Sequence, residues 1–305
     1  MPRPAVRRAT LAALVPIVLA AALAAAPPVR TSAGQTVPEG LSLKSRVLGR
    51  DVAYAVYLPP DYATSGRRYP VVYLLHGYTD DESGWVQFGE IGQAADAAIA
   101  SREIPPMIIV MPDGGVSWYI NDAAGAVRWE DMFVEELIPH IDKTFRTRPT
   151  REFRGVAGLS MGGWGTLVHC LRHPELFAAG AAFSAAVWTD DDVAGQKQEN
   201  WDKLFGPLFG ASGLSGKDRL TAHFRAHNPL DLVRAMPEET LKKVRLYIDC
   251  GDDDFLIAGN CALHLALAAR KAAHEFRVRD GGHTWSYWRT GIVDGLKYIG
   301  QGFHR

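Results

Sequence analysis

The strongest constraint on the fold comes from short segments that are apolar along almost their whole length. Four of them lie at 71–75, 107–111, 153–158 and 178–183. Strands of this kind are typical of a parallel sheet that is buried on both faces. Longer segments with apolar residues at helical spacing separate them, and this alternation predicts a doubly wound α/β sheet.

The same alternation resumes towards the C-terminus with a strand, a helix, a strand and a final helix. Within the second predicted helix, Pro139 lacks a backbone N–H, which predicts a kink or the start of a new turn. The predicted helices lie at 91–100, 130–145, 163–174, 260–273 and from about Trp285, and the two later strands at 244–251 and 275–280.

Two alternating runs precede the first buried strand, at 41–48 and 52–58, and Gly49-Arg50-Asp51 separates them. This pattern predicts an antiparallel hairpin at the N-terminal side of the sheet. The strand and helix pattern stops between about 185 and 243, where aromatic, acidic and glycine residues are frequent. We interpret that segment as a lid-like excursion from one domain that covers 40–305, a suitable size for a single core.

The first 26 residues differ in character from the rest of the chain. Arg3, Arg7 and Arg8 precede an uncharged run rich in alanine and leucine. This composition predicts a secretory signal peptide at 1–26, followed by a polar leader at 27–39. A membrane anchor is the alternative, but the apolar run is shorter than the ~20 residues that a spanning helix needs. We therefore expect a secreted or periplasmic protein without a stable membrane partner.

Charge and cysteine content exclude several classes of protein. Loss of residues 1–26 would remove three arginines and no acid, which moves the net charge from −1 to about −4, so a nucleic-acid partner is not expected. The three cysteines show no C-x-x-C spacing and predict no metal site. Two alternatives stay open: a disulfide between Cys250 and Cys261, or three buried thiols.

Ser160 lies in a G-x-S-x-G motif between Gly158 and Gly162. By itself the motif is a modest signal, but here it falls where a predicted strand ends and a predicted helix begins. That setting predicts the sharp turn that exposes a nucleophilic serine in α/β-hydrolases.

A serine hydroxyl needs a general base, and the base needs an acid that orients it. In the α/β-hydrolase order both follow the serine, with the acid first. Of the later histidines, His283 lies in a glycine-containing loop directly after a predicted strand, and we expect it to be the base. His264 and His274 belong to a helical segment, and His304 is next to the chain end. Spacing alone leaves the acid open among Asp252, Asp253 and Asp254, with Asp249 inside the strand end.

An oxyanion hole needs two backbone N–H donors. We expect one from Met161, the residue after the serine. The other is expected from Tyr78, in the loop that follows the strand at 71–75. We interpret His76 in the same loop as a structural histidine without a role in proton transfer.

Several segments of the chain together resemble the putative-esterase family, which includes feruloyl and acetylxylan esterases, tributyrin-type esterases, S-formylglutathione hydrolases and mycolyltransferases. The resemblance implies an α/β-hydrolase fold, and it places the acid three residues after Gly251, on Asp254. The matching segments are VVYLLHGYTDDESGW, PPMIIVMPDGG, EDMFVEELIPHIDKTF, FRGVAGLSMGGWGTL, DCGDDDFL and GGHTWSYW.

The resemblance constrains the substrate less than the reaction, because the segment at 185–243 matches no single subgroup. We expect Gly77, Trp85, Trp188 and Trp285 to line the substrate site, with Trp285 the best placed because it follows His283 closely. Trp118 is a further candidate. Eight tryptophans are equally compatible with core packing.

We therefore predict a secreted serine carboxylesterase that acts through an acyl-enzyme, on small-molecule or polysaccharide-linked esters such as feruloyl or acetyl esters. The expected catalytic residues are Ser160, Asp254 and His283, and this cycle needs no metal or organic cofactor. One alternative is acyl transfer of the mycolyltransferase type. Another is a non-catalytic binding protein on a hydrolase scaffold, which the presence of every catalytic group disfavours.

Overall fold

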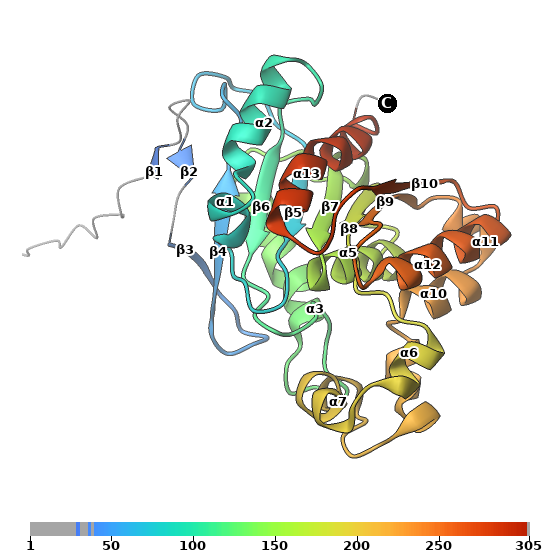
Figure 1. Cartoon of the computed structure of the whole chain (residues 1–305). Helices are drawn as coiled ribbons and strands as arrows, with labels where there is room; N and C mark the ends of the chain where they lie inside the picture. Colours follow the sequence, from blue (N-terminus) through green and yellow to red (C-terminus); the bar gives the residue numbers. More distant parts are fainter. Residues whose placement is uncertain (1–28, 31–35, 38–39, 304–305) are drawn as a thin grey trace, which may run out of the picture.

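A computed structural model describes residues 29–30, 36–37 and 40–303 (Figure 1). The predicted signal peptide and most of the predicted polar leader lie outside these residues. Two short strands from the leader, β1 (Val29–Arg30) and β2 (Thr36–Val37), form an antiparallel pair. Within the described residues, no helix is both long and apolar enough to cross a membrane.

The centre of the fold is an eight-stranded sheet in the order β10-β9-β8-β7-β5-β6-β4-β3. The six strands from β10 to β6 run parallel, whereas β4 pairs antiparallel with both β6 and β3. The predicted parallel sheet with an N-terminal antiparallel hairpin is therefore confirmed. The strands are β3 (Leu41–Lys44), β4 (Asp51–Tyr57), β5 (Val71–Leu75), β6 (Ile108–Pro112), β7 (Arg154–Leu159), β8 (Ala179–Phe183), β9 (Arg245–Gly251) and β10 (His274–Arg279).

Helices cover both faces of this sheet (Figure 1). One face packs against α1, α2 and α13, and the other against the helices between α3 and α5 together with α10 and α12. Because both faces are covered, the central strands β5 to β8 are buried along their whole length, as their continuous apolar sequences predicted. These helices are α1 (Gly84–Gln87), α2 (Ile91–Ala100), α3 (Trp129–Asp131), α4 (Ile138–Thr144), α5 (Met161–Arg172), α10 (Pro229–Ala235), α12 (Ile257–Ala269) and α13 (Trp285–Gly300).

The helix predicted at 130–145 is not continuous. A π-helical turn, Met132–Leu137, lies between α3 and α4, and Pro139 occupies the first turn of α4. Proline has no N–H to donate to the preceding turn, so the wider turn falls where a regular α-helix would leave a carbonyl without its partner.

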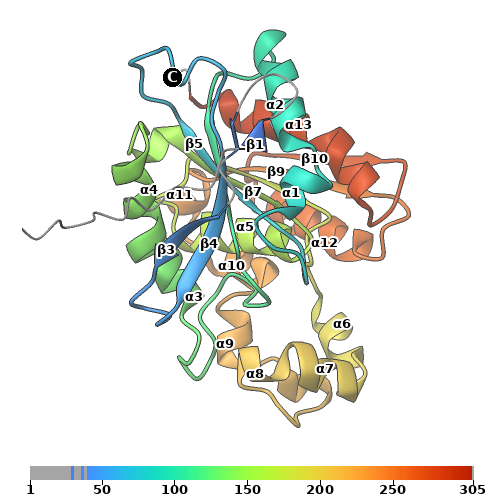
Figure 2. The same ribbon diagram turned by 90° about the vertical axis from the view of Figure 1, so that its left-hand side faces the viewer.

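Within the segment at 185–243, the helices α6 to α9 form a group below the carboxyl edge of the sheet, whereas α10 and α11 lie beside the sheet (Figure 2). Arg219 is buried within the segment and donates hydrogen bonds to the carbonyls of Val193, Gln196 and Leu214. Its guanidinium also lies over the Trp201 ring, so a single cation joins several turns of the segment. The elements added here are α6 (Asp190–Gly195), α7 (Gln198–Leu204), α8 (Gly206–Phe209), α9 (Ala222–Arg225) and α11 (Glu238–Leu241), with short 3-10 turns at Gly216–Arg219 and, before β7, at Arg151–Phe153.

A buried carboxylate connects this segment to the body of the domain. Glu130 of α3 is 3% exposed and accepts hydrogen bonds from Arg172 (2.8 Å) and His173 (2.7 Å) at the end of α5. His227, which leads into α10, lies 3.5 Å from the other carboxylate oxygen. Burial alone would raise the pKa of Glu130, but hydrogen bonds from His173 and His227 and the charge of Arg172 hold it well below its ordinary value.

We expect Glu130→Gln to destabilise the protein by about 3 kcal/mol at pH 7, because Arg172 and His173 lose the buried carboxylate to which they donate. A carboxyl whose folded pKa is depressed stabilises the fold above its unfolded pKa, and this contribution decreases as pH falls towards the folded pKa. The difference in the free energy of unfolding between wild type and Glu130→Gln is therefore expected to decrease below about pH 4.5. Urea unfolding at pH 7, 5, 4 and 3 measures it. Glu238→Gln, at an exposed ion pair with Lys242, is the matched control and is expected to change little.

Candidate active site

Ser160 occupies the turn between β7 and α5. Its φ is 53° and its ψ −114°, a conformation that residues other than glycine rarely adopt. The flanking glycines make the turn possible: a Cβ on Gly162 would lie 2.4 Å from the Leu75 carbonyl oxygen, and one on Gly158 would lie 2.5 Å from the Gly162 oxygen. The predicted strand, turn and helix therefore occur at this motif, and they hold the serine at the carboxyl edge of the sheet.

A chain of hydrogen bonds joins the serine to a histidine and a carboxylate. His283 Nε2 lies 2.9 Å from Ser160 Oγ, and His283 Nδ1 lies 2.9 and 3.1 Å from the two oxygens of Asp254. The three side chains come from positions separated by up to 123 residues, and the order along the chain is serine, acid, histidine. With Nδ1 donating to the carboxylate, Nε2 is free to accept the serine proton.

Asp254 is held as an anion by its surroundings. It is 2% exposed, and the backbone N–H of Leu256 donates to its Oδ1 at 2.9 Å. Burial raises the pKa of this carboxyl, but hydrogen bonds from His283, Leu256 and Ser184 outweigh burial and lower the pKa below its usual range. The buried Trp288 donates to Ser184 at 2.9 Å and packs edge-on against the His283 ring. Trp288 therefore contacts both the imidazole and a hydrogen-bond donor to Asp254.

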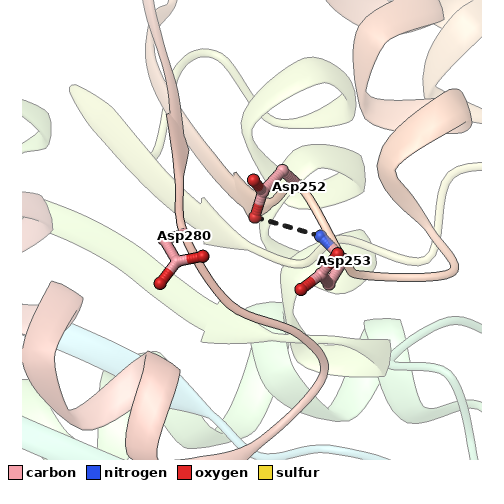
Figure 3. A group of neighbouring side chains, drawn as sticks. All are labelled: Asp252, Asp253 and Asp280. Carbon is pink, nitrogen blue, oxygen red and sulfur yellow. Dashed lines mark hydrogen bonds between the residues drawn. The ribbon is translucent and has the colours of Figure 1, made fainter.

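The two neighbouring acids are placed differently from Asp254. Asp252, Asp253 and Asp280 are exposed, and their oxygens gather within 4.8 Å of one another (Figure 3). Asp252 accepts hydrogen bonds from the N–H groups of Asp253 (3.1 Å) and Gly281 (3.0 Å). Its carboxylate therefore joins the loop that carries Asp254 to the loop that carries His283.

An ion pair with a buried carboxylate holds the residues on both sides of the His283 loop. Asp249 on β9 is fully buried and receives two hydrogen bonds from Arg279 at the end of β10, at 2.9 and 3.1 Å. The hydroxyls of Tyr247 and Tyr287 also donate to Asp249. Since Arg279 and Tyr287 flank the loop on either side, this carboxylate fixes both of its ends. This role of Asp249 was not predicted from the sequence, although an acid inside an apolar strand is the signal of a buried charge that requires partners.

The loop after β5 lies against the serine. A Cβ on Gly77 would be 3.8 Å from the Ser160 Cβ. His76 Nε2 accepts from the Gly114 N–H at 2.8 Å, so its Nδ1 carries the proton and donates to the Gly77 carbonyl at 2.8 Å. This bond fixes the peptide whose N–H belongs to Tyr78. Within the described residues, the N–H groups of Tyr78 and Met161 donate to no backbone carbonyl in a turn, loop or helix cap.

The tryptophans proposed for substrate binding separate into different environments. Trp85 is fully buried and donates to the Leu75 carbonyl, so the expectation that it lines the substrate site is wrong: its ring is part of the core. Trp285 is half-buried and packs between Trp85 and the exposed Phe88. Trp188 is half-buried and packs against Trp118 and Phe205.

A groove of about 350 Å³ adjoins the loop after β5 at Tyr78. The loop after β6 contributes Val116 and Val127, and the segment at 185–243 contributes Leu204 and Leu208. Arg50, Asp122 and Lys203 add charged groups to this lining. A groove at the carboxyl ends of parallel strands is the usual position for a ligand in this type of fold.

The fold and the arrangement of serine, histidine and acid define the class of α/β-hydrolases. The Putative esterase family model matches residues 45–299, and the chain therefore belongs to this family. A solved ferulic acid esterase is similar with a TM-score of 0.75 and 30% identity, over 88% of this chain and 99% of that one.

Two curated relatives cover different shares of the chain. The endo-1,4-beta-xylanase/feruloyl esterase of Xylanibacter ruminicola is 37% identical over 149 residues, which is 47% of this chain and 20% of that protein. The acetyl esterase of Caldicellulosiruptor saccharolyticus is 24% identical over 278 residues, which is 86% of this chain and 97% of that enzyme. The chain thus spans only a fifth of the first of these relatives.

Proposed function

We propose that the chain is a serine carboxylesterase in which Ser160, His283 and Asp254 form the catalytic triad. The observation that carries this proposal is the continuous hydrogen-bond chain from Ser160 Oγ through His283 to the buried Asp254. Cys170, Cys250 and Cys261 are free thiols in this structure, so the alternative of a Cys250–Cys261 disulfide is not observed.

In the proposed cycle, Ser160 Oγ attacks the ester carbonyl carbon while His283 Nε2 takes the serine proton. Asp254 stabilises the imidazolium, and the N–H groups of Tyr78 and Met161 bind the oxyanion. His283 then gives the proton to the leaving alcohol oxygen as the ester C–O bond breaks. A water molecule, deprotonated by the same histidine, hydrolyses the acyl-enzyme and restores Ser160.

Feruloyl or acetyl esters attached to plant polysaccharide are the proposed substrates. The names of the two curated relatives and of the similar solved structure support this choice. The groove beside Tyr78 offers an apolar surface for an acyl or sugar group. Export through the signal peptide at 1–26, with removal of that segment, would bring the enzyme to such substrates outside the cell.

A fluorophosphonate probe tests the assignment of the nucleophile directly. An activated serine oxygen attacks phosphorus and displaces fluoride, which leaves a stable adduct. We expect stoichiometric labelling of the intact protein, with the adduct mapped by mass spectrometry to the peptide that contains Ser160. Competition by methyl ferulate or an acetyl ester should slow the labelling. An adduct on any other serine would contradict the proposed triad.

A further inference from the structure

Phe255 is the most exposed of the large apolar side chains in the described part of the chain, at 76%. It directly follows Asp254, and its ring centroid lies 4.7 Å from that of His283, with the two planes tilted by 48°. Single exposed apolar residues are common on protein surfaces. This one is unusual in its position, because it contacts the proposed general base.

Phe255 lies in a hydrogen-bonded turn in which the two adjacent side chains face the core. Asp254 N–H donates to the Gly251 carbonyl, and Ile257 N–H donates to the Asp254 carbonyl at 2.9 Å. The side chains on either side, Asp254 and Leu256, both point inwards and are almost fully buried. The turn is therefore held by backbone hydrogen bonds while the Phe255 ring lies exposed beside His283, where burial against a ligand would be favourable by the hydrophobic effect.

The proposed cycle identifies the part of the substrate that passes this ring. His283 receives the proton of Ser160 and must deliver it to the oxygen of the leaving alcohol, so that alcohol lies against the imidazole. Phe255 packs on the same imidazole. An alcohol that extends away from the reacting carbon therefore has the Phe255 ring as a neighbour.

We propose that Phe255 is a platform for the leaving group and that this group is a neutral sugar whose ring packs its C–H face on the phenyl ring. This inference rests on the proposed function. Asp252, Asp253 and Asp280 lie on the two loops that carry Asp254 and His283, and they are exposed. Their carboxylates can accept hydrogen bonds from sugar hydroxyls, whereas they would repel an anionic leaving group.

The test compares two esters that share an acyl group but differ in the alcohol: methyl ferulate and the feruloyl ester of arabinose. Both give the same acyl-enzyme, so only acylation can distinguish them. Phe255→Ala is expected to lower the ratio of kcat/KM for the arabinose ester to that for the methyl ester by about 10-fold, mainly through KM. Phe255→Tyr is expected to restore the ratio, because the aromatic face is kept.

Phe88→Ala is the matched control, since Phe88 is also exposed (48%) but packs on Trp285. It is expected to leave the ratio unchanged. An unchanged ratio in Phe255→Ala, including the case of equal losses on both esters, would overturn the proposed platform. The wild-type enzyme reports separately on the function: hydrolysis of methyl ferulate, or of an acetyl ester in the same pairing, supports the esterase. If the wild-type enzyme hydrolyses none of these esters, both the esterase function and the role of Phe255 are contradicted.

Discussion

Ser160→Ala is expected to reduce kcat for ester hydrolysis by about 10⁴- to 10⁶-fold while the protein stays folded. The substitution removes the only atom that can form the acyl-enzyme in the proposed cycle. Alanine fits the site sterically, because it is smaller than serine. The same positive φ is required of either residue, so the strain in the turn is not relieved.

The measurement is steady-state hydrolysis of short-chain aryl esters, with circular dichroism and thermal unfolding of the same samples. Ser286→Ala is a suitable control, because Ser286 is exposed and its hydroxyl bonds to Thr284, close to the His283 loop. We expect that variant to stay within about twofold of wild type. Near-normal hydrolysis by Ser160→Ala would remove the basis of the proposed mechanism.

The sheet could be predicted from the sequence because its physical cause is local. A strand buried on both faces, such as Val71–Leu75, has to be apolar along its whole length, and that pattern is visible without coordinates. The turn at Ser160 was also predictable, since Gly158 and Gly162 are required by close approach of backbone to backbone.

Other features depend on contacts that the sequence does not show. Trp85 and Trp285 differ in burial although both were expected to line the substrate site, because burial is decided by which helix covers which strand. The role of Asp249 needed the knowledge that β10 lies beside β9, which brings Arg279 within hydrogen-bond distance. The π-helical turn before Pro139 likewise follows from packing as well as from the missing N–H.

The choice among three consecutive acids is the point at which sequence spacing fails most clearly. Asp252, Asp253 and Asp254 are equivalent in chemistry, and the resemblance to the esterase family favoured the third. In the structure, Asp254 is the one that faces inwards and contacts His283, whereas the other two are exposed. Direct replacement of each acid tests this distinction.

On short-chain aryl esters, which carry no sugar, Asp254→Asn is expected to lower kcat by about 10³- to 10⁴-fold, whereas Asp252→Asn and Asp253→Asn are expected to stay within about threefold of wild type. An amide in place of Asp254 carries no charge to stabilise the imidazolium. If its NH₂ group donates to His283 Nδ1, the proton lies on Nε2, which then cannot accept the proton of Ser160. At position 252, asparagine removes the charge but keeps an oxygen that can accept from the Gly281 N–H, so the two loops stay joined. A large loss in Asp252→Asn would then point to charge near the histidine, and a large loss in Asp253→Asn would move the acid itself.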